Sequence, residues 1–221
     1  MDWNLLLLAL VFALADWYCV AAGKIKLRWF TKPAVILTLL VGFTLGGGWH
    51  GQTYWFGMGL IFSLAGDVFL VLPPRFFLAA LSIFLAAHIM YILGFSQGLT
   101  LPGWGAAFPL SGLIVADFFA YHWLRQALVA RTKGRWLRFP IHLYQIIISL
   151  MLLTALQTLW RADWPGSSAW LASAGALLFF VSDTILAYNR FVALIRGGKL
   201  LVIITYHLGQ AALICGVLLR G

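Results

Sequence analysis

The sequence contains no glutamate, and its six acidic residues are all aspartates. Only 10% of the 221 residues are charged, whereas 63% are hydrophobic. A soluble domain of this length could not bury so much apolar surface, so the composition predicts a polytopic membrane protein. No stretch is left over for a separate soluble domain. We therefore interpret residues 1–221 as a single transmembrane domain.

The sequence also lacks the motifs of covalent and metal catalysis. It has no GxSxG elbow, no Walker loop, no CxxC pair, and no HxxxH or HExxH spacing. Any chemistry is therefore expected to be acid–base chemistry, and neither a cofactor nor a metal site is predicted. The net charge of +9 lies in short loops between apolar runs, a topological pattern that does not indicate a nucleic-acid partner.

Apolar segments of membrane-spanning length recur along the chain. A transmembrane helix needs about 20 apolar residues, and each segment reaches or approaches this length. The sequence therefore predicts an all-α bundle of eight transmembrane helices. The segments cover roughly 4–22, 33–48, 54–72, 76–96, 105–124, 139–160, 169–189 and 199–218.

Basic residues predict the orientation of this bundle. They gather in the loops after the first, third, fifth and seventh segments, whereas the opposite face has only Arg161 and Arg220. Because positive loops remain in the cytoplasm, both termini are expected on the non-cytoplasmic side. The predicted location is the cytoplasmic (inner) membrane.

The two halves of the chain, about 1–98 and 105–221, look duplicated. The stretch from Gly59 to Asp67 has nearly the same layout as that from Gly175 to Asp183. Each half also carries a histidine in its last segment, with a polar residue three positions later. Four segments per unit is an even number, so we expect a parallel 4+4 repeat about an axis along the membrane normal.

Four aspartates lie inside the predicted helices. From the rise per residue, Asp16, Asp67, Asp117 and Asp183 lie roughly 10–12 Å from the cytoplasmic edge. Each costs on the order of 3 kcal/mol in a membrane, so four in one layer indicate a shared polar site. We expect Asp67 and Asp183 to face each other, one protonated as a general acid and the other ionised as a general base.

Other polar residues share this layer, and several interpretations of their roles are open. Ser63 belongs to a small-residue strip that could be only a packing seam. His88 with Tyr91, and His207 with Gln210, could bind a substrate, form interhelical hydrogen bonds, or hold a metal together with the two aspartates. Lys32 is expected at the inner rim, as a phosphate-binding residue or as an ordinary anchor.

With these residues in this order, the sequence resembles the YhhN family of lysoplasmalogenase-type membrane proteins. The resemblance covers nearly the whole chain and also includes Tyr144, Ser182 and Tyr206. It completes a candidate site with Asp67 and Asp183 as catalytic residues. The candidate substrate-binding residues are Lys32, Ser63, His88, Tyr91, Tyr144, Ser182, Tyr206, His207, Gln210 and Asp16.

The resemblance implies hydrolysis of the vinyl-ether bond of lysoplasmalogens, which are alkenyl-glycerophosphoethanolamines or -cholines. The products would be a fatty aldehyde and a glycerophospho-head-group. Protonation of the β carbon of the vinyl ether gives an oxocarbenium ion, which water captures. The implied partners are the lysophospholipid substrate and membrane lipids.

Two other functions fit the same residues. The aspartates could relay protons in a small transporter or lipid flippase built from the repeat. Alternatively, His88 and His207 could bind a metal in a lipid hydrolase. A purely structural role would leave several carboxylates in one layer without a reason.

Overall fold

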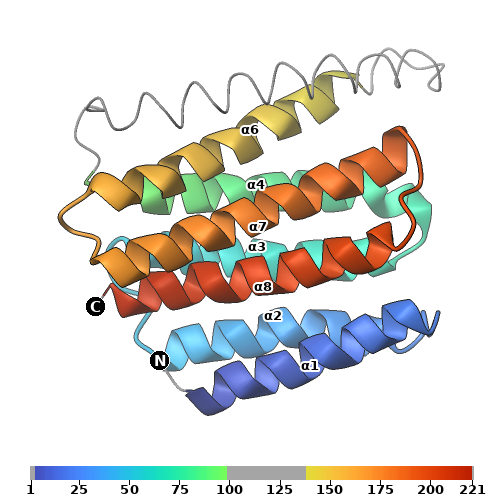
Figure 1. Ribbon diagram of the computed structural model, residues 1–221, viewed down its shortest axis with the longest axis horizontal. Helices are drawn as coiled ribbons and strands as arrows, with labels where there is room; N and C mark the ends of the chain where they lie inside the picture. The colour runs from blue at the N-terminus through green and yellow to red at the C-terminus, as the bar shows by residue number, and fades with distance from the viewer. Residues whose placement is uncertain (1–2, 99–137, 221) are drawn as a thin grey trace.

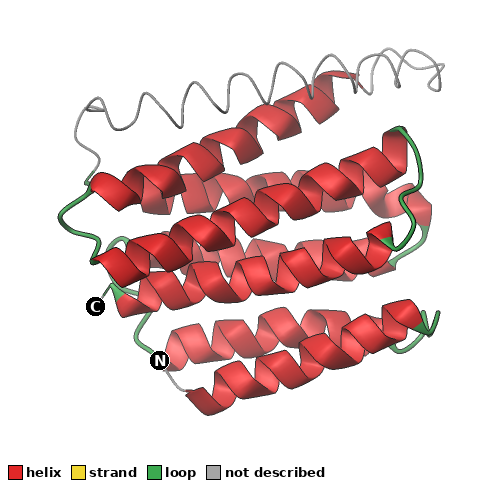
Figure 2. Cartoon of the chain, viewed as in Figure 1, coloured by secondary structure: helices red, strands yellow, loops and turns green. Residues whose placement is uncertain are grey.

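The computed structural model describes residues 3–98 and 138–220. Every regular element in these residues is helical (Figures 1 and 2). The elements are α1 (Trp3–Ala21), α2 (Arg28–Leu45), α3 (Thr53–Val71), η1 (Pro74–Phe76), α4 (Phe77–Ser96), α6 (Arg138–Gln157), η3 (Thr158–Trp160), α7 (Gly166–Phe191) and α8 (Gly198–Leu219).

The expected all-α membrane architecture is confirmed in this part of the chain. It contains seven helices that are long and apolar enough to cross a membrane. They correspond to seven of the eight predicted segments. The segment 105–124, with Asp117, lies outside the described residues. The total of eight helices and the side on which the termini lie therefore stay predictions.

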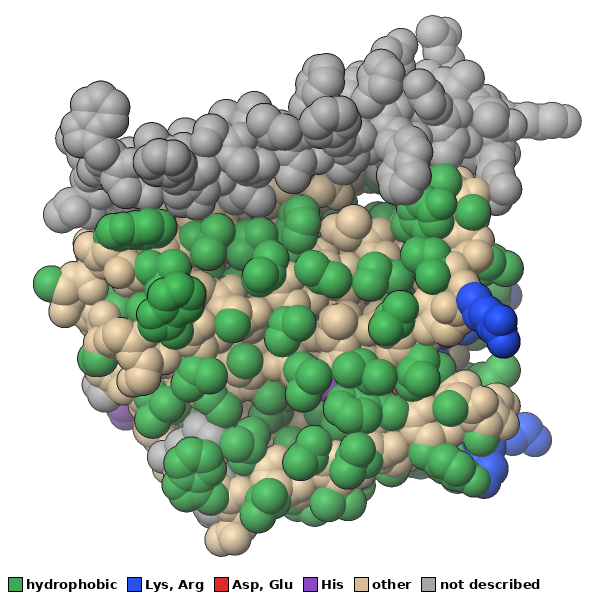
Figure 3. All heavy atoms as spheres, in the orientation of Figure 1, with side chains coloured by type: hydrophobic (Ala, Val, Ile, Leu, Met, Phe, Trp, Pro, Cys, Tyr) green, Lys and Arg blue, Asp and Glu red, His purple; other side chains and the backbone are tan. Residues whose placement is uncertain are grey.

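The helices pack side by side in two layers (Figure 1). One layer contains α2, α3 and α4, and the other contains α1, α8 and α7. The closest pairs are α7 with α8, α3 with α4, and α1 with α2, and α6 packs against both α4 and α7. On the face shown in Figure 3 the surface is mainly hydrophobic, and the Lys and Arg side chains gather at the end with the α1–α2 and α7–α8 loops.

Glycine allows the backbones of α7 and α8 to touch. A Cβ on Gly175 would lie 2.3 Å from the backbone nitrogen of Leu213 and 2.7 Å from the carbonyl oxygen of Gly209. No larger residue fits at such a distance, so Gly175 fixes the crossing of these two helices. Gly59 has a similar role on α3, where a Cβ would lie 2.2 Å from the ring of Tyr91.

The start of α2 differs from the expectation. Pro33 was predicted to begin this helix, but the helix begins at Arg28 and Pro33 lies inside it. The first turn is held from outside, because the side chains of Arg28 and Thr31 both bind Asp16 of α1. These contacts outweigh the backbone hydrogen bond that proline removes. As a result, Lys32 lies within the helix and not in a loop.

The close pairing of α3 with α4 and of α7 with α8 is compatible with a repeat in which these pairs correspond. The repeat also requires the segment 105–124. For that reason the parallel 4+4 repeat, with halves of about 1–98 and 105–221, stays a prediction.

Candidate functional site

Asp67 lies at the centre of a sealed cluster between α2, α3 and α8. Its side chain is fully buried. The hydroxyl of Tyr206 donates a hydrogen bond of 3.0 Å to Oδ2. Lys32 Nζ lies 2.9 Å from Oδ1 and forms an ion pair with the carboxylate. Together these partners offset the cost of a carboxylate in the bundle interior.

The position of Lys32 is a correction to the sequence interpretation. It was expected at the membrane rim, where it could hold a phosphate. Instead, only 4% of it is exposed, and its ammonium also lies 5.6 Å from the centre of the Tyr206 ring. The early start of α2 places this lysine inside the bundle, where its positive charge is balanced by the Asp67 carboxylate.

Asp183 has a different set of partners, on α4 and α6. His88 Nε2 lies 3.1 Å from Oδ2 of Asp183, and the hydroxyl of Tyr144 donates a short hydrogen bond to the same oxygen. His88 Nε2 also lies 3.1 Å from the Tyr144 hydroxyl, so the three groups form a closed triangle. Two polar partners on one oxygen hold the Asp183 carboxyl group in a fixed orientation.

Asp183 also lines a cleft between α4, α6 and α7, whereas Asp67 is sealed. The Asp183 side chain keeps 9% of its surface exposed. The cleft is lined by Phe77, Leu81, Ile141, Tyr144, Gln145, Ile148, Asp183, Leu186, Ala187 and Phe191. Its lining is predominantly apolar. The cleft has a volume of only about 20 Å³, room for about one water molecule, so a lipid chain would have to widen it to reach the Asp183 carboxyl.

The structure does not bring the two carboxylates together. Among the described residues no hydrogen bond or ion pair joins Asp67 to Asp183, and their hydrogen-bonding partners are all different. Phe179 packs against both partner sets, with its ring centre 4.7 Å from that of His88 and 5.2 Å from that of Tyr206. The expected facing pair is thus replaced by two clusters linked through an aromatic ring.

Three of the predicted substrate-binding residues bind one another. Tyr91 donates a hydrogen bond of 2.9 Å to Gln210 Oε1, and the Gln210 amide donates one of 2.9 Å to Ser63. The Ser63 and Tyr91 hydroxyls lie 3.5 Å apart. All three side chains are buried. Their polar atoms are engaged in joining α3, α4 and α8, which favours a structural role.

Ser182 and Asp16 likewise have partners within the bundle. Ser182 donates a hydrogen bond of 2.9 Å to the carbonyl of Val202 on α8. Asp16 accepts hydrogen bonds from Arg28 at 3.2 Å and from Thr31 at 2.7 Å. Both residues therefore link neighbouring helices, outside the clusters around Asp67 and Asp183.

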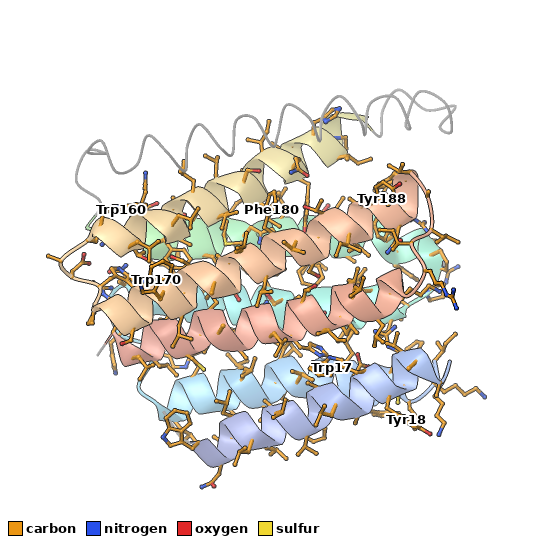
Figure 4. All side chains as sticks on the ribbon, in the orientation of Figure 1. Trp17, Tyr18, Trp160, Trp170, Phe180 and Tyr188 are labelled. Carbon is orange, nitrogen blue, oxygen red and sulfur yellow. The ribbon has the colours of Figure 1, made fainter. Side chains whose placement is uncertain are left out.

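His207 points to the other side of α8, toward α1. The indole of Trp17 donates a hydrogen bond of 3.2 Å to His207 Nδ1. Figure 4 shows Trp17 between α8 and the α1–α2 pair. Trp17 was not assigned to the polar layer from the sequence. Its position directly after Asp16 was the signal that could have assigned it to the polar layer.

A separate charged network lies at the opposite ends of the helices. Asp163, in the loop before α7, contacts Arg161 Nη2 and Arg220 Nη2, each at 2.7 Å. Hydrogen bonds from Arg161, assisted by the positive charges of Arg161 and Arg220, lower the pKa of Asp163. Arg161 also donates to the carbonyls of Phe95 and Gln97, so the network ties α4 to α7 and α8.

Within residues 3–98 and 138–220, no three His, Cys, Asp or Glu side chains converge as metal ligands would. His88 lies against Asp183, whereas His207 lies against Trp17. The metal alternative needed both histidines beside the aspartates, and these contacts do not provide that arrangement.

Comparisons with known proteins identify relatives in mammals and bacteria. A lysoplasmalogenase TMEM86B of Mus musculus is 31% identical over 170 residues, covering 76% of this chain and 66% of the relative. A lysoplasmalogenase TMEM86A of Homo sapiens is 30% identical over 157 residues, covering 69% and 60%. A membrane protein YhhN of Escherichia coli O157:H7 is 27% identical over 201 residues, covering 89% and 91%.

The chain thus spans about two thirds of the length of these mammalian relatives. No solved structure is significantly similar to it. The YhhN family model matches residues 27–217, which include both aspartate clusters. The resemblance noted in the sequence is therefore confirmed, and the chain belongs to the YhhN family.

Proposed function

We propose that this chain is a membrane-embedded hydrolase that cleaves the vinyl-ether bond of lysoplasmalogens. The names of the mammalian relatives support the reaction and the substrate class. The observation that carries the proposal is the Asp183 carboxyl, which His88 and Tyr144 orient at an apolar cleft. An alkenyl chain needs an apolar environment, and its cleavage needs a positioned acid.

The reaction can be written with Asp183 as the proton carrier. Protonated Asp183 transfers its proton to the β carbon of the vinyl ether, and the π electrons form the new C–H bond. The resulting oxocarbenium ion is stabilised by the Asp183 carboxylate. Water then adds to the α carbon and loses a proton to that carboxylate. The hemiacetal hydroxyl then gives up its proton as the bond to the glycerol oxygen breaks, the glycerol oxygen takes up a proton from protonated Asp183, the hydroxyl proton returns that carboxyl to its acid form, and the fatty aldehyde is released.

The two aspartates then divide the roles that the sequence gave to a facing pair. Asp67 is sealed and paired with Lys32, so we assign it to holding α2, α3 and α8 around the site. Asp183 reaches the cleft and has a histidine that can accept or donate a proton beside it. His88 and Tyr144 act as positioning residues for its carboxyl group.

The test is aldehyde release from a lysoplasmalogen by the purified full chain, reconstituted in lipid nanodiscs. We expect Asp183→Asn to reduce kcat by about 10²–10⁴-fold, the usual contribution of general acid–base catalysis. Thr184→Val is the matched control, because Thr184 is the exposed neighbour of Asp183 on α7. It should retain full activity.

An inactive wild-type chain would overturn the proposal, as would full activity of Asp183→Asn. Lipid scrambling or proton-coupled uptake in liposomes, without aldehyde release, would favour the transporter or flippase alternative. Full activity after removal of bound metals, with no stoichiometric metal in the protein, would leave no role for metal ligation by the two histidines.

A further inference from the structure

Arg190 lies beside the cleft at Asp183, where α7 reaches the end of the bundle. It belongs to the last turn of α7, at the end where Lys and Arg side chains gather (Figure 3). Its guanidinium carbon lies 4.7 Å from the centre of the Phe77 ring. Phe77 lines the cleft, as does Phe191, and the centres of these two rings lie 6.0 Å apart. The guanidinium is thus held against a ring that forms part of the cleft wall.

Arg190 and Asp183 lie on the same face of α7. They are seven residues apart, and an α-helix drifts by only about 20° over that interval. Their separation along the helix axis is roughly 10 Å, from the rise of 1.5 Å per residue. Ala187 lies between them on this face and lines the cleft. A ligand along this strip can therefore contact the carboxyl group with one part and the guanidinium with another.

The charge of Arg190 has no protein counter-ion within residues 3–98 and 138–220. The ion pairs of the described aspartates are all made with other side chains. Contact with the Phe77 ring positions the guanidinium without supplying an oxygen that accepts its N–H groups. These donors remain available to an anion from outside the protein. The planar fork of a guanidinium fits phosphate especially well, because two parallel N–H groups can bind two phosphate oxygens.

The spacing matches two parts of a lysoplasmalogen molecule. From the β carbon of the vinyl ether to phosphorus, the path runs through the ether oxygen, the three glycerol carbons and one phosphate oxygen. These seven bonds span about 9 Å when extended, at roughly 3.8 Å for every three bonds. The phosphate can thus lie at Arg190 while the β carbon lies at Asp183. The head group then stays at the end of the bundle, and only the chain has to widen the narrow cleft.

We propose that Arg190 binds the phosphate of the lysolipid substrate and so sets the depth at which the vinyl ether meets Asp183. This inference rests on the proposed function and adds the residue that recognises the head group. It replaces the interpretation in which Lys32 holds the phosphate, since Lys32 is buried against Asp67. The described carboxylates are all engaged elsewhere, so ethanolamine and choline head groups should bind equally well.

A ligand that cannot be cleaved tests the phosphate site without turnover. 1-O-Hexadecyl-glycerophosphocholine has the chain, glycerol and phosphate of the substrate, but its ether is saturated. 1-O-Hexadecylglycerol lacks the phosphate. Tritiated forms of both are bound to the purified full chain in a maltoside detergent, which contains no phosphate to compete. We expect the phospholipid to bind at least about tenfold more tightly, as a hydrogen bond to a charged group would provide.

Variants assign this preference to one side chain. Arg190→Gln should weaken binding of the phospholipid by about tenfold or more and leave binding of hexadecylglycerol unchanged. Arg190→Lys keeps the charge and loses the fork, so it should bind the phospholipid with intermediate affinity, and it serves if Arg190→Gln does not fold.

Arg75→Gln is the matched control. Arg75 is also exposed, and its guanidinium carbon lies 4.9 Å from the centre of the Phe76 ring, which does not line the cleft. This variant should leave both affinities unchanged. An arginine that served only as a membrane anchor would behave like Arg75.

The aldehyde-release assay gives a second readout. Arg190→Gln should raise KM for a lysoplasmalogen by about tenfold, because it removes binding that the substrate and the transition state share. The kinetics of a 1-alkenylglycerol, which has no phosphate, should be the same for Arg190→Gln and wild type.

Equal affinity of the wild type for the two ether ligands would overturn the inference. Unchanged phospholipid binding in both Arg190 variants, or an equal loss in Arg75→Gln, would do so too. Displacement of the phospholipid by an equal concentration of inorganic phosphate would assign Arg190 to free phosphate instead of a lipid.

The binding assay is independent of the hydrolase assay. If the chain cleaves lysoplasmalogen but its affinity does not depend on Arg190, only the phosphate site is wrong. If Arg190 determines phospholipid binding in a chain that releases no aldehyde, the phosphate site stands and the hydrolase proposal fails.

Discussion

Tyr206 of α8 donates a hydrogen bond of 3.0 Å to Asp67 of α3. Tyr144 of α6 donates in the same way to Asp183 of α7. The second partner distinguishes the two clusters, because Asp67 has Lys32 and Asp183 has His88. A lysine carries a fixed charge at neutral pH, whereas a histidine can gain or lose a proton. Under the proposed function, the Asp183 cluster is the one that exchanges a proton with the substrate.

Removal of Lys32 should destabilise the protein strongly. In Lys32→Ala the Asp67 carboxylate stays buried without its counter-charge, which typically costs about 3–5 kcal/mol. We expect a large loss of thermal stability in detergent. The double variant Lys32→Met with Asp67→Leu should recover much of it, since both charges are then absent. Lys199→Ala is the control, because Lys199 is exposed at the start of α8. Equal stability of Lys32→Ala and wild type would contradict the ion pair.

Loss of the Tyr144 hydroxyl should affect activity more than stability. Tyr144→Phe removes the hydroxyl that donates to Asp183 Oδ2 and leaves the contact with His88. Misplacing a catalytic group by about 1 Å can cost about 100-fold in rate, so kcat should fall by about 10–100-fold. Tyr18→Phe, at a 60% exposed position on α1, should change neither activity nor stability. Full activity of Tyr144→Phe would assign Tyr144 to packing alone.

Two glycines of α7 provide a matched pair of substitutions. Gly175→Ala places a methyl group 2.3 Å from the Leu213 nitrogen and should cost about 1–3 kcal/mol through forced separation of α7 and α8. Gly166→Ala meets nothing within 4 Å and should be neutral or slightly stabilising. Thermal unfolding in the same detergent measures both. A stable Gly175→Ala variant would show that the helix crossing has more room than the structure indicates.

The Asp163 network should make the thermal stability of the protein depend on pH. Because its pKa is lowered in the folded state, Asp163 stabilises the fold fully above the ordinary carboxyl value of about 3.9. This contribution is lost as the pH falls through the lower folded value. Wild type should therefore melt above Asp163→Asn at pH 7, and the difference should shrink below about pH 4. The carboxyl is 41% exposed, so screening should keep the effect small. A difference that is independent of pH would contradict the charge-based account.

The apolar runs predicted most of the fold because a membrane helix is defined by length and composition. The ends of the helices were harder to predict, as α2 shows. Pro33 marked a helix start by its local preference, but contacts from Arg28 and Thr31 to Asp16 extended the helix backward. The contacts come from another helix, and the sequence of α2 alone carries no sign of them.

The members of the polar layer were identified from sequence, but their pairing was not. Depth along a helix follows from counting residues, whereas the direction of a side chain depends on how each helix is rotated against its neighbours. Asp67 and Asp183 were predicted in one layer, and they have different partners, Lys32 and His88. Likewise, His207 Nδ1 accepts its hydrogen bond from the indole of Trp17 on α1, a contact between two distant parts of the chain.

The backbone contact at Gly175 prevents α7 and α8 from moving independently of each other at their crossing. No side chains lie between the two helices at that crossing, so neither helix can slide or rotate there without a clash. Asp183 is part of α7, and Tyr206, which holds Asp67, is part of α8. Under the proposed function, a substrate that widens the cleft at Asp183 displaces α7, and α8 with Tyr206 moves with it. The two carboxylates would then be coupled through the helix pair, although their hydrogen-bonding partners differ.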